Sequence, residues 1–464
     1  MSRWRKLGIN VLLMTIGSIG TKVLAFLLVP LYTSVLSTQD YGVSDLIVTT
    51  ISLLMPLFTA TISESMLRFA LEDNYDKKQI FTIGIIVNLI GFALLLCFSP
   101  LIFFVELLRP YYICFLVYYL VNSLYVSLSS YTRGIGKVTL FTVSGVCQTI
   151  ALLVSNIIGL VVLHRGIEGY LFSYIFSNLF AIAVLIFGGK EFQYWISPKK
   201  IDKSMVKTML RYSVPMIPNS ISWWVSNSSD KYILTAICGA TVNGIYSVAY
   251  KIPTILSVFY NIILSAWRLS AVEDFGSEET SAFYSSVYRK MEGGLVLVSA
   301  GIILFNKLLS RLLYAKDFYS ARFFVPVLVI AFLLHGLGEF YGSIYTSARQ
   351  TGVLFYSSLT GAICNIILNI ILIPQFGGLG AAIATLLSYG IILIFRAVHS
   401  RKIMKMKIDY RHGTLAMILL VAMCIVQTID FSYAFIFAAV LFSLLLVLER
   451  NVGLEISRKF LAKQ

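Results

Sequence analysis

The sequence predicts an all-α polytopic membrane protein of about fourteen transmembrane helices. We expect two parallel six-helix repeats around a central cavity, followed by a C-terminal helix pair. Hydrophobic residues make up 58% of the 464 residues and charged residues only 13%, whereas soluble proteins carry roughly 25% charged residues. Long uncharged apolar runs recur along the chain, and basic residues gather in alternate connections. This composition excludes a soluble enzyme.

Uncharged apolar runs give the first spans, because lipid cannot satisfy exposed backbone groups and a crossing segment must be helical. Each of the following runs is long enough to cross a hydrocarbon layer of about 30 Å: Phe81–Phe104, Tyr111–Thr132, Val138–Leu163 and Gly169–Gly189. Thr351–Phe395 is also uncharged but twice as long. The turn-forming segment Pro374–Gly378 splits it into two spans.

Runs that one or two charges interrupt bring the count to twelve spans. They are Ile9–Leu36, Gly42–Leu67, Tyr212–Ile237, Gly244–Trp267, Met291–Leu313 and Phe323–Ser347. Gly413–Leu448 is broken only by Asp430 and predicts two short spans joined by a tight turn. We expect fourteen spans rather than twelve, with this last pair the least regular.

The basic residues predict the orientation. The net charge is +15, and the predicted inside segments hold 28 of the 37 Lys and Arg residues, with Arg396–Arg411 among them. The predicted outside loops hold six: Arg109, Arg165, Lys307, Arg311, Lys316 and Arg322. By the positive-inside rule, both termini are cytoplasmic. The positive charge therefore indicates the cytoplasmic loops of a multi-pass membrane protein, without a nucleic-acid partner.

Two halves of the chain are weakly similar to each other. Tyr131-Thr132 and Leu140-Phe141 recur as Tyr345-Thr346 and Leu354-Phe355, and Gly166–Gly169 matches Gly377–Gly380. Six spans per half is an even number, so both halves enter from the same side as parallel repeats. We expect these parts: an N-terminal lobe over 1–189, a basic cytoplasmic linker over 190–211, a C-terminal lobe over 212–396, and a basic loop, helices 13–14 and tail over 397–464.

Ionisable residues inside the predicted spans are the candidate substrate-binding residues, because each costs about 2.5–3.5 kcal/mol at the bilayer centre. They are Lys22, Glu64, Arg68, Asp230, Lys231 and Lys251. Lys22 and Lys251 are expected near mid-membrane with no acid on the same helix. Structural alternatives are that Glu64 and Arg68 neutralise each other at i,i+4, and that Asp230 and Lys231 pair with neighbouring helices. Glu339 is a further acid, in the tenth span.

The sequence contains no pattern for catalysis, a metal or a cofactor. Gly134-Ile135-Gly136-Lys137 lacks the flanking residues of a phosphate-binding loop. The six cysteines are isolated within predicted spans, which is typical of small packed residues rather than of disulfides or zinc sites. We expect a transporter rather than an enzyme.

Several segments together resemble a known superfamily. Thr21–Phe26, Pro30, Tyr32 and Tyr41-Gly42 resemble the opening of the multidrug/oligosaccharidyl-lipid/polysaccharide exporter superfamily. Ser229–Leu234 and Gly244–Lys251 resemble its polysaccharide-exporter branch, the Wzx-like flippases of O-antigen and capsule biosynthesis. In the related lipid II flippases a basic position of the first helix and an acidic position of the second line the cavity. The resemblance implies this role for Lys22 and Glu64, and a lipid-tail groove at spans 13 and 14. It also implies the bacterial inner membrane as the location.

The expected function is a flippase that translocates polyprenyl-diphosphate-linked oligosaccharide repeat units from the inner to the outer leaflet by alternating access. The buried lysines would meet the diphosphate, and membrane lipids would surround the protein. A coupling ion, H⁺ or Na⁺, is an expected partner, as are a polysaccharide polymerase and a chain-length regulator. One alternative is an ion-coupled multidrug exporter of the same fold, whose cavity should contain more acidic than basic residues. Another is a membrane glycan polymerase or ligase, which needs a larger outer loop.

Overall fold

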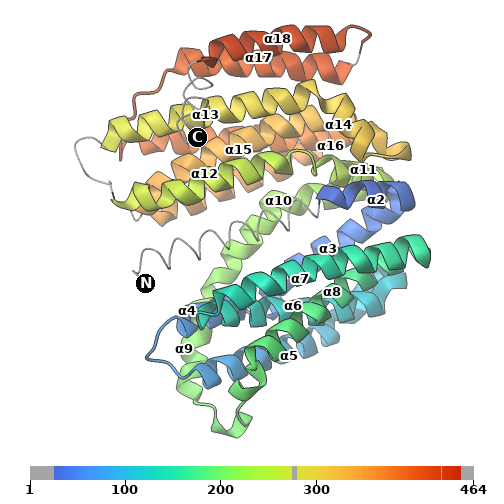
Figure 1. The fold of residues 1–464 in the computed structure, drawn as a ribbon, viewed down its shortest axis with the longest axis vertical. Helices are drawn as coiled ribbons and strands as arrows, with labels where there is room; N and C mark the ends of the chain where they lie inside the picture. The colour runs from blue at the N-terminus through green and yellow to red at the C-terminus, as the bar shows by residue number, and fades with distance from the viewer. Residues whose placement is uncertain (1–25, 274–279, 349, 430, 451–464) are drawn as a thin grey trace, which may run out of the picture. The chain divides into compact units, whose positions relative to one another are not determined.

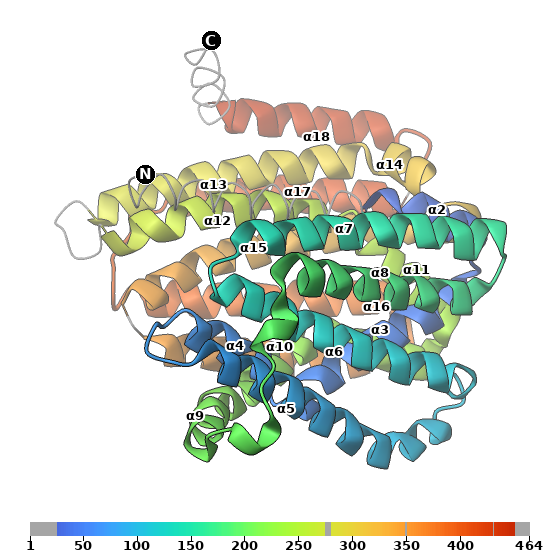
Figure 2. The same cartoon turned by 60° about the horizontal axis from the view of Figure 1, so that its bottom comes forward.

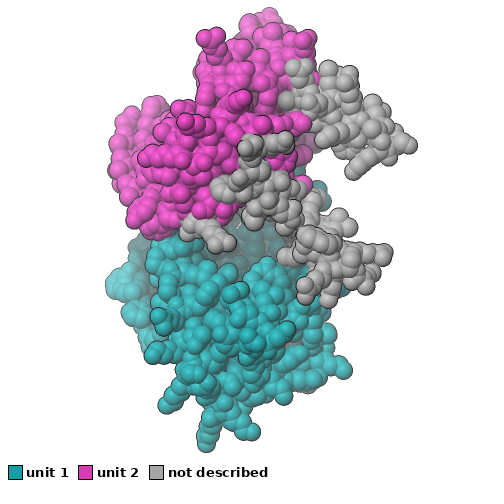
Figure 3. All heavy atoms as spheres, turned by 90° about the vertical axis from the view of Figure 1, so that its left-hand side faces the viewer, with its two compact units in different colours: residues 1–225 teal, residues 226–464 magenta. Residues whose placement is uncertain are grey.

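The structure is a computed structural model that describes residues 26–273, 280–348, 350–429 and 431–450. The described residues form helices and connecting turns, and they divide into two compact units, 1–225 and 226–464 (Figure 3). The lobe and linker boundaries expected from the sequence stay a prediction. The two units are described separately below.

Unit 1 is built from antiparallel helices, of which α6, α7 and α8 lie side by side (Figures 1 and 2). Its longer helices and their extensions are α2 (Val29–Val35), α3 (Thr38–Phe58), α4 (Ile62–Ala70), α5 (Lys77–Phe98), η1 (Ser99–Phe104), η2 (Arg109–Tyr111), α6 (Tyr112–Gly134), α7 (Val138–Asn156), the π-helical η3 (Ile157–Val162) and α8 (Gly166–Gly189). The connection to unit 2 contains η4 (Glu191–Tyr194), η5 (Pro198–Lys200), α9 (Lys203–Ser213) and η6 (Val214–Met216). The four uncharged runs in this half are confirmed as helices.

The expected single helix over Gly42–Leu67 is wrong. Helix α3 ends at Phe58, just after Pro56, and Ala60 and Thr61 adopt left-handed φ angles of 51° and 47° before α4 begins. Thr61 Oγ1 donates to the Ser213 carbonyl at 2.6 Å, and Ser65 Oγ donates to the Met209 carbonyl at 2.6 Å. These contacts hold α4 against α9, so Glu64 and Arg68 lie on a separate short helix.

Unit 2 contains the remaining helices. After α10 (Ile217–Cys238), which crosses the boundary between the units, come α11 (Ala240–Ala249), α12 (Thr254–Glu273), α13 (Thr280–Leu304), α14 (Asn306–Leu313), η7 (Lys316–Phe323), α15 (Val325–Ser347), α16 (Thr351–Ser400), α17 (Tyr410–Ile429) and α18 (Ala434–Leu448). Helix α15 packs most extensively on α16, and α17 and α18 form a hairpin beside α13 (Figure 1).

Two expected spans of unit 2 are bent rather than straight. Helices α11 and α12 meet at 43° around Pro253, and α13 and α14 meet at 65°. Lys251 therefore lies in the turn between α11 and α12 instead of in the middle of a helix. Proline and short breaks are the usual causes of such bends.

The predicted split of the long apolar run is confirmed at Gly377. This residue has φ 55° and ψ −131°, a conformation that favours glycine. The two halves of α16 then pack antiparallel, since a Cβ at Gly380 would lie 2.3 Å from the Leu372 carbonyl oxygen.

The same hairpin occurs in unit 1. There Gly166 has φ 51°, and a Cβ at Gly169 would lie 2.7 Å from the Gly159 carbonyl oxygen. The glycines of the sequence repeat thus make equivalent turns in the two units.

The helices are long and apolar enough for a polytopic membrane protein. Among the described residues, eight helices satisfy these criteria, or ten if each bent pair makes one span. The expected number of fourteen stays a prediction.

Candidate functional site in unit 2

A buried carboxylate, Asp230, is the centre of the candidate site. It lies on α10 and is only 3% exposed. Its Oδ2 accepts hydrogen bonds from the hydroxyls of Tyr246 at 2.7 Å and Tyr250 at 2.9 Å, and its Oδ1 accepts from the Lys231 backbone N–H at 2.9 Å. Tyr246 and Tyr250 are four residues apart around the end of α11, which places both phenols on one face.

Helix α16 adds uncharged oxygen atoms to this site. Thr385 Oγ1 lies 3.4 Å from both tyrosine hydroxyls. Nearby on α10, Ser229 Oγ donates to Asn365 Oδ1 at 3.4 Å, and Asn369 Nδ2 donates to the same oxygen at 2.9 Å. Side chains of α10, α11 and α16 therefore gather hydroxyl and amide groups around one acid, and we call these residues the Asp230 cluster.

This arrangement favours an exchangeable cation. A buried carboxylate is strongly disfavoured without a compensating charge or hydrogen bonds. Hydroxyl and amide oxygens can accept hydrogen bonds from a proton carrier such as hydronium, or they can coordinate a hard cation such as Na⁺. The cluster thus has the chemistry to bind and release a small cation, which a purely packing residue does not need.

Lys231 and Lys251 are half-buried in the same unit. Lys231 directly follows Asp230 on α10, and Lys251 directly follows Tyr250 in the turn before α12. Both predicted lysines are thus direct sequence neighbours of members of the Asp230 cluster, and the structure places both in unit 2.

The predicted unit 1 residues are arranged differently. Glu64 and Arg68 are exposed on α4, and Arg68 Nη2 lies 2.8 Å from Glu72 Oε1, so Arg68 pairs with Glu72 rather than with Glu64 as the structural alternative had it. Lys22 lies outside the described residues.

A second buried polar group was missed by the sequence reasoning. Arg396, expected in a cytoplasmic loop, is 4% exposed and lies 2.9 Å from Glu339 Oε1. It also donates to Ser357 Oγ, Ser358 Oγ and the Gly338 carbonyl. Arg396 directly follows the long uncharged run, so the sequence did not show whether its side chain lies in a loop or is buried at the end of the span.

His335 on α15 and Tyr389 on α16 have rings in contact with each other. His335 Nδ1 is 3.1 Å from the Tyr260 hydroxyl, and its ring centroid is 4.6 Å from that of Tyr389. Tyr389 donates to Asn227 Oδ1 at 3.3 Å. No sequence signal links these residues, because they come from four helices far apart in the chain.

Unit 1 has a buried tyrosine cluster of its own. The rings of Tyr32 and Tyr170 are 5.1 Å apart, those of Tyr170 and Tyr174 are 5.0 Å apart, and those of Tyr118 and Tyr174 are 5.4 Å apart. Such rings combine apolar faces with polar hydroxyls. The sequence singled out only Tyr32 among these residues, as part of a family motif, and it gave no sign of the cluster.

Comparison with known families gives a match over more than half of the chain. Residues 7–268 match the family described as polysaccharide biosynthesis protein. The chain is 22% identical over 217 residues to the probable low-salt glycan biosynthesis flippase Agl15 of Haloferax volcanii, covering 46% of each chain. It is 27% identical over 363 residues to the probable flippase AglR of the same organism, covering 70% of this chain and 69% of that one. The chain thus spans about half the length of the first of these relatives.

Solved structures share the fold. The lipid II flippase MurJ in an inward closed conformation matches with a TM-score of 0.70 at 14% identity, covering 97% of this chain and 100% of that chain. An inward-facing multidrug resistance MATE family transporter of the MOP superfamily matches with a TM-score of 0.66 at 13% identity, covering 82% and 94%. At these identities the likeness establishes the fold, an all-α polytopic membrane architecture.

Proposed function

Because the chain belongs to the polysaccharide biosynthesis protein family, we propose that it is a flippase for lipid-linked glycans. It translocates polyprenyl-diphosphate-linked oligosaccharide repeat units from the inner to the outer leaflet of the cytoplasmic membrane, for surface polysaccharide biosynthesis. The flippase names of the two Haloferax relatives support this substrate class. The observation that carries the proposal is the buried Asp230 cluster with Lys231 and Lys251 beside it in sequence, inside a polytopic helical protein.

The charges of the site suit such a substrate. A polyprenyl diphosphate has an apolar tail, an anionic diphosphate and a polar glycan. Lys231 and Lys251 supply cations for the diphosphate. Lys22, Glu64 and Arg68 stay proposed substrate-binding residues of unit 1, and Glu64, as an acid, is not assigned to the diphosphate. An ammonium group binds phosphate as a compact point charge.

Asp230 has a different role in this proposal. A carboxylate repels a diphosphate, so we assign it to the coupling ion, H⁺ or Na⁺. Cation binding at Asp230 neutralises the buried charge and changes its hydrogen bonds to Tyr246 and Tyr250. Since Tyr246 lies on α11 and Tyr250 directly follows its last residue, just before the 43° bend to α12, the bend is the element through which ion binding and alternating access are linked.

The multidrug exporter remains a second candidate because Asp230 is an acid of the kind that binds cationic drugs. A strain that lacks the gene distinguishes the glycan flippase from the multidrug exporter. If the chain is a glycan flippase, its loss leaves lipid-linked oligosaccharide in the inner leaflet and reduces surface polysaccharide, and a plasmid copy restores both. Unchanged polysaccharide together with altered drug tolerance would favour the exporter.

Point substitutions refine this test. Lys231→Ala and Lys251→Ala should fail to restore polysaccharide in the deletion strain, whereas Lys316→Ala should restore it. Lys316 is an exposed basic residue of η7 and serves as the matched control. Restoration by all three variants would contradict the assignment of the two lysines.

A further inference from the structure

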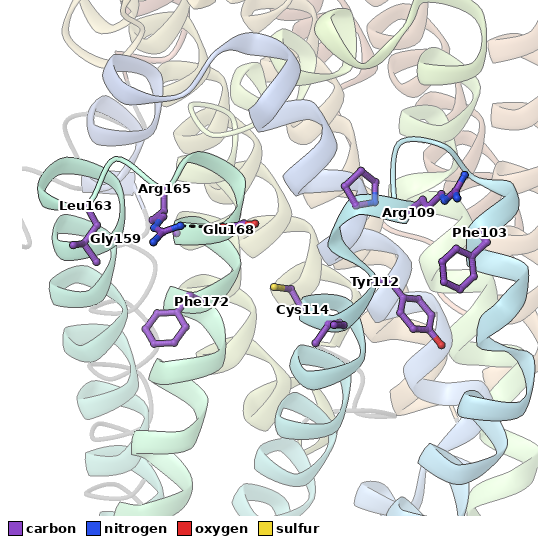
Figure 4. Close-up of a pocket in the computed structure, with 12 residues that line it drawn as sticks. Phe103, Arg109, Tyr112, Cys114, Gly159, Leu163, Arg165, Glu168 and Phe172 are labelled. Carbon is purple, nitrogen blue, oxygen red and sulfur yellow. Dashed lines mark ion pairs between the residues drawn. The ribbon is translucent and has the colours of Figure 1, made fainter.

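A groove of about 760 Å³ lies on unit 1, and none of its lining residues belongs to the Asp230 cluster. Its lining comes from η1, η2 and the start of α6 on one side, and from η3 and the start of α8 on the other (Figure 4). We call it the outer groove, because its basic residues Arg109 and Arg165 belong to the loops that the charge distribution predicts to be outside. Its volume falls within the range of small-molecule sites, about 300–1,000 Å³.

The first wall is held together by aromatic and hydrogen-bonding contacts. The rings of Phe103 and Tyr112 are 4.7 Å apart, and the Tyr112 hydroxyl lies 2.6 Å from Ser99 Oγ. The Arg109 guanidinium lies 5.9 Å from the centroid of the Phe103 ring. This cation–π contact places a positive charge at the rim of an aromatic wall.

The second wall carries the other arginine. Backbone contact between Gly159 and Gly169 brings η3 close to α8. Arg165 immediately precedes α8 and lies 3.9 Å from the Glu168 carboxylate, with both side chains more than half exposed. Such an exposed pair contributes little energy, so Arg165 retains the capacity to bind another anion.

The interior between the walls is apolar and open. Ile113 is 74% exposed and Phe172 is 59% exposed. In Figure 4, the sulfur of Cys114 projects from α6 toward α8 into the space between the walls. Apolar side chains this exposed in a membrane protein face acyl chains rather than water.

We propose that the outer groove binds an anionic phospholipid of the outer leaflet. Its acyl chains cover Ile113 and Phe172, and its phosphate lies at the rim of the groove, where Arg109 and Arg165 lie on opposite walls (Figure 4). Two arginines and one carboxylate give the rim a net positive charge, which complements one anionic headgroup. Arginine also suits phosphate because its planar guanidinium donates two parallel hydrogen bonds.

Native mass spectrometry of the full-length protein tests this proposal. The purified chain is titrated in detergent with phosphatidylglycerol or with phosphatidylcholine, and the bound fraction is measured. We expect the double variant Arg109→Gln/Arg165→Gln to bind phosphatidylglycerol about fivefold more weakly or worse, with little change for phosphatidylcholine. Arg311→Gln, an exposed arginine of α14 in unit 2, is the matched control and should bind both lipids as the unsubstituted chain does.

Two further variants distinguish the groove from general surface charge. Glu168→Gln removes the competing carboxylate and should tighten phosphatidylglycerol binding. Cys114→Trp fills the groove without changing its charge and should weaken it. The proposal is overturned if the double arginine variant keeps its phosphatidylglycerol affinity, or if Arg311→Gln loses as much. Tight binding of phosphatidylcholine that the arginine substitutions do not alter would also overturn it, by showing an apolar lipid contact without headgroup recognition.

Discussion

The side-chain groups that donate hydrogen bonds to Asp230 do not come from its own helix. The two phenol donors lie around the end of α11, sixteen and twenty residues later in the chain, and Thr385 comes from α16, 155 residues later. All of these residues are buried or nearly so. The carboxylate is therefore fixed in place by hydroxyl groups that come from other helices of unit 2.

Removing one of these hydroxyls tests the cluster. Tyr250→Phe deletes a hydrogen bond to a buried charged group, so we expect it to lower the free energy of unfolding by about 1–3 kcal/mol. Thermal unfolding of the purified protein in detergent measures this loss as a lower midpoint. Tyr356→Phe is the control, because Tyr356 is 64% exposed on α16. Equal midpoints for the two variants would show that the bond to Asp230 adds no stability.

The Glu339–Arg396 pair gives a second prediction at this scale. Glu339→Gln leaves a buried arginine without its counter-charge, which costs about 3–5 kcal/mol. The double variant Glu339→Leu/Arg396→Met removes both charges and should regain most of the lost stability. Glu168→Gln, in the exposed Arg165–Glu168 pair, should change stability by about 1 kcal/mol or less. A small effect of Glu339→Gln would mean that water reaches Arg396.

The sequence revealed the acids and bases of the site but not their partners. Asp230, Lys231 and Lys251 stood out because charge is rare in apolar runs. Tyr246, Tyr250 and Thr385 did not, because tyrosine and threonine are common in membrane helices and only the fold brings these three together. Arg396 was misplaced because a basic residue at the end of a span looks the same whether it faces a loop or a buried acid.

At the scale of elements, uncharged length was the reliable signal. The runs that became α5, α6, α7 and α8 contain no charge, and a long apolar run has no stable alternative to a helix in lipid. The break between α3 and α4 was not predictable in this way. It depends on left-handed backbone at Ala60 and Thr61, which contacts with α9 compensate, and neither residue type usually marks such a turn.

The turn at Gly377 gives a prediction for an element. Gly377→Ala forces a side chain into a conformation that only glycine adopts readily, at a cost of about 1–3 kcal/mol. Gly352→Ala is a matched control, because a Cβ has open space at both positions but Gly352 has no positive φ. Thermal unfolding should show a lower midpoint for Gly377→Ala alone. A similar midpoint for both variants would contradict the assigned backbone conformation.

Helix α9 should respond to pH through its N-cap. Hydrogen bonds from the Ser204 hydroxyl and backbone N–H lower the pKa of Asp202. The carboxylate therefore stabilises the folded helix above the pKa of the unfolded chain, and this contribution is lost as the pH falls through the lower, folded pKa. The protection of the α9 amides, which is their exchange rate relative to that of an unfolded chain at the same pH, should fall in that acidic range. In Asp202→Ala the exchange should already be fast at neutral pH, and an unchanged profile in that variant would exclude the cap as the cause.

At the scale of the whole molecule, the two units repeat one helical hairpin. Gly166 and Gly377 both adopt a positive φ, and Gly169 and Gly380 both pack against the backbone of the preceding helix. The sequence repeat predicted this equivalence from the match of Gly166–Gly169 with Gly377–Gly380. The chemistry placed on the two units differs, since the Asp230 cluster lies in unit 2 and the outer groove lies in unit 1.

The charged residues of unit 2 suit a flippase of the proposed kind. Transport of a large anionic lipid needs cationic contacts and, where an ion drives it, a site whose charge changes during the cycle. Lys231 and Lys251 meet the first need and Asp230 meets the second. The most informative experiment therefore measures transport and its ion dependence together in a purified system.

Reconstitution into liposomes with a fluorescent polyprenyl-diphosphate oligosaccharide provides that measurement. The fraction of labelled lipid that a membrane-impermeant reagent reaches over time reports flipping. We predict that the protein speeds flipping, that Lys231→Ala/Lys251→Ala abolishes it while Lys316→Ala does not, and that Asp230→Asn removes its response to a proton or sodium gradient. Flipping at the rate of protein-free liposomes, or flipping unaffected by loss of both lysines, would contradict the account.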